Sequence, residues 1–366
     1  MAAAERKRRL LCCRTEETKM TDILSLTPDE LKQELSLLGL PAYRAKQVSE
    51  WLKRGVRDFS DMTNLPKELR ETLCTQFSLA APRLLRSQHS ALDGTGKFLW
   101  GLSDENCVET VLMRYRYGNS VCISSQVGCR QGCAFCASTL GGLVRSLTSG
   151  EMLDEVLFTE LENDVKISNV VLMGIGEPLD NLDNVLRFLH LVSHPEGRNL
   201  SLRHITVSTC GKPDGIRRLA EEKLPITLSV SLHAPDDETR SKIMPSNCGI
   251  ELLTEACQQY FHSTGRRLSF EYAMIDKVND SDDQAVMLAR LANRLGAHVN
   301  LIPLNYVAER GLKPSPASVI RHFQEMLEQR KVNVTVRRSL GGDIDASCGQ
   351  LRRRHLKSDL QHVRIP

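Results

Sequence analysis

The chain has 366 residues, of which 41% are hydrophobic and 25% are charged, an ordinary globular composition with enough length for one large domain and a smaller one. The formal net charge of +3 permits a nucleic-acid partner without requiring one. No apolar run is long enough to span a bilayer, which excludes a membrane-spanning class of protein.

The N-terminus is polar and basic, and we expect residues 1–20 to be disordered because they lack hydrophobic periodicity. The apolar run at 10–13 is too short for the core of a signal peptide. We therefore expect a cytoplasmic protein without membrane association. In a reducing compartment its 12 cysteines serve as metal ligands, catalysts or free thiols rather than as a disulfide framework.

Residues 21–84 are predicted to form a small helical accessory domain. Thr27 suits an N-cap, Pro28 suits the first helical position, and Glu30 completes a capping box. The leucines expected on one face of this helix are Leu31, Leu35 and Leu38. Further helices are expected over 44–53 and 66–74.

From residue 85 onward the pattern changes to short β-rich runs separated by helical stretches. The expected strands are 120–124, 169–173, 204–208, 226–232, 268–274, 298–302 and 332–337. The expected helices between them are 149–161, 182–193, 211–222 and 281–295. This alternation predicts an α/β fold with a parallel sheet, an incomplete barrel over 85–350, followed by a basic C-terminal tail over 351–366. In such folds the chemistry lies at the carboxyl ends of the strands.

A cysteine-rich loop runs from Gly128 to Thr139, with Cys129, Cys133 and Cys136 in a C-x3-C-x2-C spacing. A structural zinc site would need four ligands, usually as two separated pairs, and a redox disulfide would show C-x2-C alone. An iron–sulfur cube normally takes four cysteines. Three cysteines therefore favour a [4Fe–4S] cluster whose fourth iron stays open to a substrate or cofactor.

This spacing after the first strand of an incomplete α/β barrel resembles the signature of the radical S-adenosylmethionine (SAM) superfamily. The resemblance implies a (β/α)6-type radical SAM barrel. It also implies that the amino and carboxylate groups of SAM occupy the fourth iron, where an electron from the cluster splits SAM. Phe135 matches the aromatic residue that commonly precedes the last cysteine.

A longer set of motifs is similar to the RlmN/Cfr family of RNA adenine methyltransferases, with the RlmN type closest. The similarity covers roughly 22–352, and each block alone would be weak, but their order is specific. The matching blocks are Val108–Val111, Cys122–Cys129, Gly174–Leu179, Thr206–Thr209, Ser229–Pro235, Glu271–Asp276, Val278–Asp280, Asn300–Asn305 and Gly342–Leu351.

The resemblance implies methylation of carbon C2 of an adenosine in 23S ribosomal RNA, adenosine 2503 in the family, with adenosine 37 of tRNA as a further substrate. Neither C2 nor C8 of adenine attacks a methyl group directly, so a radical route is required. By position, Cys348 is the methyl-carrying cysteine, Cys122 the resolving thiol, and Glu109 the proton acceptor. The implied intermediate is a transient covalent adduct between protein and RNA.

Alternatives remain open at this point. The same residues would serve C8 methylation, the Cfr-type reaction. A radical SAM enzyme that modifies a protein would have no use for Cys348. An electron carrier would have no use for the Gly-Glu-Pro block, and a fourth cluster ligand supplied by Cys122 or Cys348 would close the open iron.

The resemblance also assigns a SAM pocket. The Gly176-Glu177 pair is expected to hold the methionine ammonium group, because a carboxylate pairs well with an ammonium at a partly buried strand end. The positions that match the remainder of the pocket are Ser208, Ser231, Leu232, His233 and Asn305. The implied cofactors are a [4Fe–4S] cluster and two SAM molecules per turnover.

The expected partners are 23S ribosomal RNA, tRNA, and a reductant such as flavodoxin or ferredoxin, and the expected oligomeric state is a monomer. Arg337 and Arg338 precede Cys348, and a run of three arginines over 352–354 follows it, which suggests a clamp for RNA phosphates. Basic residues of the front domain are a second candidate surface. They are Arg44, Lys46, Lys53, Arg54 and Arg57.

Overall fold

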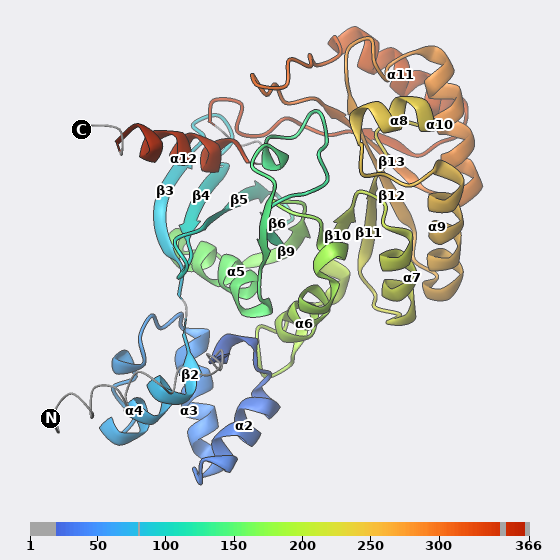
Figure 1. The fold of residues 1–366 in the computed structure, drawn as a ribbon. Coiled ribbons are helices and arrows are strands. Elements are labelled where there is room, and N and C mark those ends of the chain that lie inside the picture. Colours follow the sequence, from blue (N-terminus) through green and yellow to red (C-terminus); the bar gives the residue numbers. More distant parts are fainter. Residues whose placement is uncertain (1–19, 80, 345–348, 363–366) are drawn as a thin grey trace, which may run out of the picture.

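The computed structural model describes residues 20–79, 81–344 and 349–362, and its N-terminal part is a separate group of helices (Figure 1). Thr27 and Glu30 form the predicted capping box at the start of the first helix. The helices are α2 (Pro28–Leu37), α3 (Ala42–Lys53) and α4 (Lys67–Gln76), and the short strands β1 (Thr21–Asp22) and β2 (Phe77–Ser78) pair in parallel beside them.

This helical unit has its own apolar core, distinct from the main core of the chain. Its fully buried members include Ile23, Leu31, Leu35, Val48, Met62 and Leu73. At the boundary with the rest of the chain, leucines of both parts line one cavity. Polar contacts add to this: Ser25 Oγ accepts a hydrogen bond from the Gly150 N–H, and the Arg187 guanidinium pairs with Glu30. The predicted small helical domain is therefore a region with its own core.

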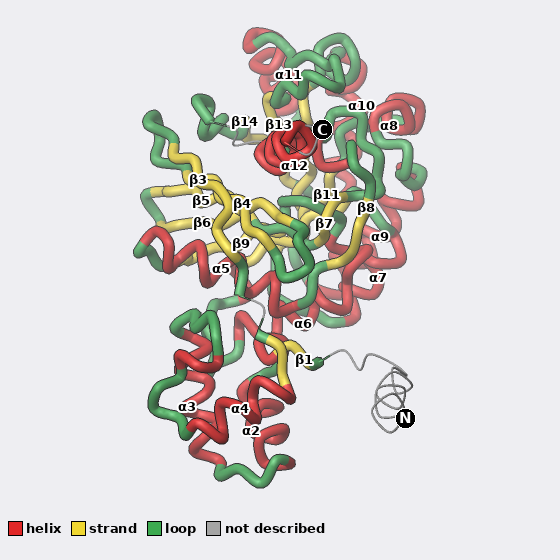
Figure 2. The backbone as a smooth tube through the Cα atoms, turned by 60° about the vertical axis from the view of Figure 1, so that its left-hand side comes forward, coloured by secondary structure: helices red, strands yellow, loops and turns green. Residues whose placement is uncertain are grey.

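The main sheet, whose strands are among the yellow segments in Figure 2, begins with antiparallel strands that the sequence pattern did not predict and continues as a parallel barrel. Its order is β14-β13-β12-β11-β10-β9-β6-β5-β4-β3, antiparallel from β3 to β6 and parallel from β6 to β14. The bounds are β3 (Arg83–His89), β4 (Gly96–Gly101), β5 (Cys107–Tyr115), β6 (Gly118–Cys122), β9 (Ile167–Leu172), β10 (Ile205–Thr209), β11 (Thr227–Ser231), β12 (Leu268–Met274), β13 (His298–Pro303) and β14 (Val334–Val336). The predicted incomplete α/β barrel is confirmed, with this antiparallel extension added.

Helices cover the outer face of the parallel strands. They are α5 (Ser149–Asn163), α6 (Leu182–Ser193), α7 (Pro213–Glu221), α9 (Ile250–Thr264), α10 (Asp282–Leu295) and α11 (Ala317–Gln329). The short helix α8 (Asp237–Ile243) instead ends beside the cysteine loop, where the Ile243 carbonyl accepts a hydrogen bond from the Ala134 N–H. The predicted helices match α5, α6, α7 and α10 within two residues at each end, whereas α8, α9 and α11 were not predicted. Within the described ranges, no helix combines the length and the apolar character needed to cross a membrane.

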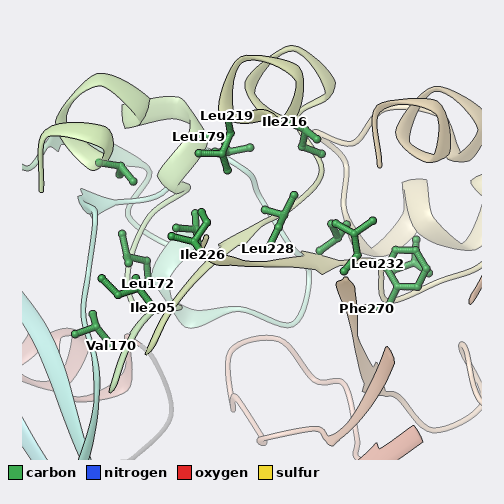
Figure 3. Packing of buried hydrophobic residues seen from close by; sticks show 14 of the residues in the cluster. Val170, Leu172, Leu179, Ile205, Ile216, Leu219, Ile226, Leu228, Leu232 and Phe270 are labelled. Atoms are coloured by element: carbon green, nitrogen blue, oxygen red, sulfur yellow. The ribbon is translucent and has the colours of Figure 1, made fainter. Parts of the chain in front are cut away.

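The main core lies between the parallel strands and these helices (Figure 3). Val170, Ile205 and Leu228 project from neighbouring strands, and Ile216 and Leu219 project from α7; all are at most 1% exposed. Burying side chains of this size contributes about 1.5–3 kcal/mol each. This packing fixes the strands, and therefore also the loops at their carboxyl ends.

The C-terminal segment is a helix, α12 (Gln350–His362), which lies beside β3, β4 and β5 in Figure 1. We expected a basic tail over 351–366, and the structure differs for a packing reason. Leu351 is buried against Leu99 and Cys107. The Glu109 carboxylate accepts hydrogen bonds from N–H groups at the start of the helix, which offsets the cost of leaving them unpaired.

Candidate active site

A cavity of about 270 Å³ opens at the carboxyl ends of the parallel strands. The cysteine loop forms one wall, and the segments after β9, β10, β11 and β13 form the others. Residues assigned to the site from sequence that line this cavity are Cys129, Cys133, Cys136, Gly176, Glu177, Ser208, Ser231, His233 and Asn305. The structure thus brings together residues that are far apart in the sequence.

The three cysteines share this cavity and influence one another electrostatically. Burial, together with the neighbouring Cys136 and Glu177, raises the pKa of Cys129 to about 11 and that of Cys133 to about 12. Thiols with such pKa values are inert as nucleophiles until a cationic group stabilises the thiolates. Among the described residues, no three His, Cys, Asp or Glu side chains lie close enough together to hold a single metal ion.

Backbone hydrogen bonds fix the shape of the cysteine loop. The Cys129 N–H donates to the Gly142 carbonyl at 2.9 Å, and the Ala134 N–H donates to the Ile243 carbonyl at 2.8 Å. Arg310 adds a contact from the loop after β13, because its Nε donates to the Cys136 carbonyl at 3.3 Å. The loop is therefore held from both sides of the cavity before any ligand binds.

Two glycines let the Gly-Glu-Pro segment approach the first barrel strand. A Cβ atom at Gly174 would lie 2.5 Å from the Ile123 carbonyl oxygen, and Gly176 has a φ of +112°. Glu177 follows, and its carboxylate accepts hydrogen bonds from the N–H groups of Leu179 at 3.0 Å and Cys210 at 2.7 Å. Burial raises the pKa of Glu177, so a cationic ligand in the cavity would favour its charged form.

His233 presents a neutral ring to the cavity. Its Nδ1 accepts a hydrogen bond from the Ala273 N–H at 3.0 Å, which leaves the proton on Nε2. Burial, together with the nearby Arg240 charge, lowers the pKa of His233 to about 3. The ring packs edge-on against Phe135, with centroids 4.8 Å apart, so this neutral histidine contacts the cysteine loop and can act as a hydrogen-bond donor.

Leu232 is the one residue of the expected SAM pocket whose side chain points elsewhere. It is 1% exposed, belongs to the main core and does not line the cavity. Only its backbone is near the pocket, and its carbonyl accepts a hydrogen bond from the Arg240 Nε at 3.1 Å.

A second cavity, of about 130 Å³, adjoins the first. Cys122, 6% exposed at the end of β6, lines it. The residues that line both cavities are Met173, Ile302, Asn305 and Arg337. The expected resolving thiol therefore lies one cavity away from the three cysteines.

Cys348, the expected methyl carrier, lies outside the described residues, but the segments on either side of it are described. On the N-terminal side, the Gly341 N–H donates to Asp93 at 2.8 Å, and Asp343 accepts from the Ala91 N–H at 2.9 Å. On the C-terminal side, Gly349 packs against Ser138, and a Cβ atom there would lie 2.7 Å from the Ser138 nitrogen. Both flanks are thus tied to the barrel, one of them beside the cysteine loop.

Glu109, the expected proton acceptor, lines neither cavity. Its carboxylate is 2.9 Å from the Lys97 ammonium group, and both side chains are almost completely buried. The same carboxylate accepts from the Gly349 N–H at 2.6 Å and from the Arg352 N–H at 2.5 Å. In this structure Glu109 anchors the start of α12.

The structure also shows buried cations that the sequence reasoning missed. Lys97 directly precedes an apolar run in β4, which is an unusual position for a lysine. This position in the sequence could have identified Lys97 as a candidate buried cation. Arg240 is fully buried and donates to the carbonyls of Cys210, Leu232 and Cys248, which ties together two strand ends that line the cavity. No sequence signal marks Arg240.

The arginine run over 352–354, which was expected to bind RNA phosphates, lies on α12 and makes contacts within the protein. The Nε of Arg352 donates to the Cys107 carbonyl, and the Nε of Arg353 donates to Glu309. Two of these three side chains are therefore held by the protein itself, whereas Arg337 and Arg338 are exposed beside the second cavity.

Comparisons with known proteins show which families this chain matches. The family model of the radical SAM superfamily matches residues 123–289. The model of the ribosomal RNA large subunit methyltransferase N-terminal domain matches residues 21–79. These two matches coincide with the barrel that carries the cysteine loop and with the separate helical unit.

Whole-length relatives extend the similarity. A probable dual-specificity RNA methyltransferase RlmN of Lachnoclostridium phytofermentans is 50% identical over 352 residues, covering 95% of this chain and 99% of that protein. The corresponding protein of Desulforamulus reducens is 49% identical over 94% of this chain and 99% of its own length. A crystal structure of a radical SAM methyltransferase from Sphaerobacter thermophilus matches with a TM-score of 0.86 and 42% identity, over 90% of this chain and 98% of that one.

Fold and site together define a radical SAM methyltransferase, an enzyme class that uses a [4Fe–4S] cluster and SAM. The residues present fit both groups, because three thiols and a buried carboxylate line the same cavity. Within that class, the chain belongs to the RlmN family of radical SAM RNA methyltransferases.

Proposed function

We propose that this enzyme methylates carbon C2 of an adenosine in 23S ribosomal RNA, adenosine 2503 in the family, and of adenosine 37 in tRNA. The dual specificity in the names of the relatives supports both substrates. The observation that carries the proposal is the position of Cys122, in a cavity that adjoins the cavity of the three cysteines. A simple SAM-cleaving enzyme would need no thiol there.

In this proposal Cys129, Cys133 and Cys136 hold the [4Fe–4S] cluster. The SAM pocket consists of Gly176, Glu177, Ser208, Ser231, His233 and Asn305, with Leu232 contributing its backbone alone. When bound, the cluster and two SAM molecules per turnover supply the one-electron chemistry and the methyl group that a polar transfer to an adenine carbon lacks. Glu177 is suited to an ammonium group, and the Nε2–H of His233 to a hydrogen-bond acceptor.

The chain's own residues would then carry the methyl group and release the product. The Cys348 thiolate holds the methyl group that becomes bonded to the adenine ring. Release follows when the Cys122 thiolate attacks the Cys348 sulfur, so that an S–S bond forms as the S–C bond to the nucleotide breaks. The electron pair of the broken bond stays with the nucleotide, whose methylene carbon takes up a proton and becomes the methyl group. Flavodoxin or ferredoxin is the proposed reductant of the cluster. Cellular thiols reduce the disulfide and so restore the resting enzyme.

Glu109 is proposed to accept the proton that the adenine ring loses. Because its oxygens bind Lys97, Gly349 and Arg352 in this structure, that role requires the start of α12 to move away during turnover. We also propose that the enzyme acts as a cytoplasmic monomer.

The test uses Cys122→Ala protein, produced in cells and purified with its cluster, and examined by nuclease digestion and mass spectrometry. The expected result is RNA covalently attached to Cys348 through a methylene group on adenine C2. Cys257→Ala, a buried cysteine on α9 outside both cavities, is the matched control and should carry no RNA.

Other outcomes separate the alternatives. Attachment at C8 would identify the Cfr-type reaction. A methylated Cys348 without RNA would support methyl transfer to the cysteine and reject RNA capture, whereas an unmodified Cys348 in cluster-loaded protein would reject the mechanism and favour a protein-modifying enzyme.

A further inference from the structure

The hairpin between β5 and β6 carries a pair of stacked tyrosines, and the inner one packs against residues that line the second cavity. Tyr115 pairs with Gly118 across the hairpin, so Arg116 and Tyr117 form its tip. The rings of Tyr115 and Tyr117 lie 4.9 Å apart between centroids and 7° from parallel. Tyr117 is 72% exposed, which is unusual for a large aromatic side chain without a partner surface.

The inner tyrosine connects this tip to the thiol of the second cavity. Tyr115 packs against the cluster formed by Val111, Met113 and Cys122, and its hydroxyl donates to the Met113 sulfur at 3.5 Å. The outer face of Tyr117 is consequently held at a fixed place relative to Cys122. A rigid aromatic face costs little conformational entropy when a planar ligand stacks on it.

The surroundings of the tyrosine pair are strongly basic. Arg337 and Arg338 line the second cavity and lie near enough to oppose the rise that burial causes in the pKa of Tyr115. Arg114 and Arg116 are exposed on the hairpin itself. In the described part of the chain, none of these four guanidinium groups forms an ion pair with a carboxylate.

An exposed aromatic face among unpaired arginines matches the chemistry of single-stranded RNA. Bases stack on aromatic rings, and arginines bind the phosphates between them. An adenine that leaves its base stack to reach a cavity also leaves a neighbouring base without a stacking partner. Tyr117 stacks on Tyr115, which packs against Cys122 and the other residues of its cluster, and from this position Tyr117 would replace that partner.

We propose that Tyr117, supported by Tyr115, is a stacking platform for a nucleotide that flanks the target adenosine, with Arg337 and Arg338 bound to the adjoining phosphates. This inference rests on the proposed RNA substrate and adds a specific contact to it. The platform holds the flipped-out conformation of the RNA rather than taking part in the chemistry.

The first test measures the affinity of cluster-loaded protein for a protein-free 23S ribosomal RNA transcript. Tyr117→Ala should weaken binding about tenfold, because stacking on an aromatic side chain is worth about 5- to 150-fold in affinity. Tyr117→Trp should retain binding, since it keeps an aromatic face. Phe261→Ala removes an aromatic side chain that is 41% exposed on α9, outside both cavities, and should leave affinity unchanged.

The second test identifies the partner base. Short RNA hairpins that contain the target adenosine are prepared with an abasic nucleotide on its 5′ side or on its 3′ side. One of these changes should weaken binding to the wild type about tenfold and have little further effect on Tyr117→Ala, because both changes remove the same contact. The iron and SAM content of each variant is measured first, so that affinities are compared between equally loaded proteins.

The outcomes distinguish this inference from the proposed function. If the wild type methylates the transcript but Tyr117→Ala binds it equally well, the platform is rejected while the RNA substrate stands. If the abasic and alanine changes are additive at both flanking positions, the platform is likewise rejected. If the wild type neither binds nor methylates the transcript, the proposed function fails and this inference fails with it.

Discussion

At the residue scale, the most informative group is the buried Glu109–Lys97 pair. A buried pair is weak evidence for stability, but removal of one partner leaves an uncompensated charge in the interior. Glu109 also accepts hydrogen bonds from Gly349 and Arg352, so its charge serves two structural purposes besides any proton transfer. The anchoring role and the proposed base role make different predictions for Lys97, which has no part in proton transfer from the RNA.

We predict that Glu109→Gln and Lys97→Met each lower the free energy of unfolding by about 3 kcal/mol, because each leaves one buried charge without its partner. The double variant should lose less free energy of unfolding than the two single variants lose together. Urea unfolding of the three variants measures this coupling.

Methylation assays on the same variants separate the two roles of Glu109. If Glu109 acts solely as a base, Lys97→Met keeps its methylation rate once it is folded. If Glu109 also anchors α12, both single variants lose rate. Additive losses of stability would show that the two side chains do not interact.

At the element scale, the docking of α12 depends on one glycine. Gly349 has a φ of +79°, and a Cβ atom there would meet the Ser138 nitrogen at 2.7 Å, a backbone atom that cannot move aside as a flexible side chain could. The left-handed conformation alone costs a residue other than glycine about 1–2 kcal/mol. α12 can therefore pack beside the cysteine loop in this way only with glycine at its start.

We predict that Gly349→Ala loosens α12 and lowers the methylation rate at least tenfold, whereas iron binding is retained. Hydrogen exchange of the α12 amides measures the loosening directly. Gly342→Ala is the control, because a Cβ atom at that position has open space around it. Equal exchange in the two variants would contradict the role given to Gly349.

At the scale of the whole molecule, the helical unit meets the barrel across a cluster of acidic side chains. Asp154 on α5 is buried and one of its carboxylate oxygens lacks a hydrogen-bond partner. Burial raises the pKa of Asp154 well above its usual value, and the nearby Asp22 and Glu151 raise it further. The interface between the two units therefore contains a carboxyl group that folding keeps from ionising freely.

We predict that Asp154→Asn raises the free energy of unfolding at pH 7 by about 1–3 kcal/mol. A carboxyl group whose pKa is raised by folding stabilises the native state while it is protonated, and that stability is lost as the pH rises through the folded pKa. The difference in the free energy of unfolding between Asp154→Asn and the wild type should therefore become smaller as the pH falls from 7 to 4. Urea unfolding at several pH values tests this, with the fully exposed Asp214→Asn as a control that should show no such trend.

Much of the architecture could be predicted from local sequence signals. The Thr27 and Glu30 capping box and the strand over 268–274 coincide with the structure. α9 was missed although Leu253, Ala256 and Tyr260 carry a readable helical period on its buried face. β3 and β4 were missed because their antiparallel pairing lies outside the strand–helix alternation on which the prediction rested.

The sequence by itself determined the class of chemistry, since the spacing of Cys129, Cys133 and Cys136 is a local property of one loop. Tertiary structure decided what surrounds that loop. Contacts such as Glu109 to Gly349 join residues 240 positions apart, and no local pattern encodes such a pairing. The same holds for the second cavity with its Cys122 thiol, which exists because β6, β13 and the segment after β14 meet at one end of the barrel. Chemistry is set by side-chain type and short-range spacing, whereas the site depends on which distant segments folding packs together.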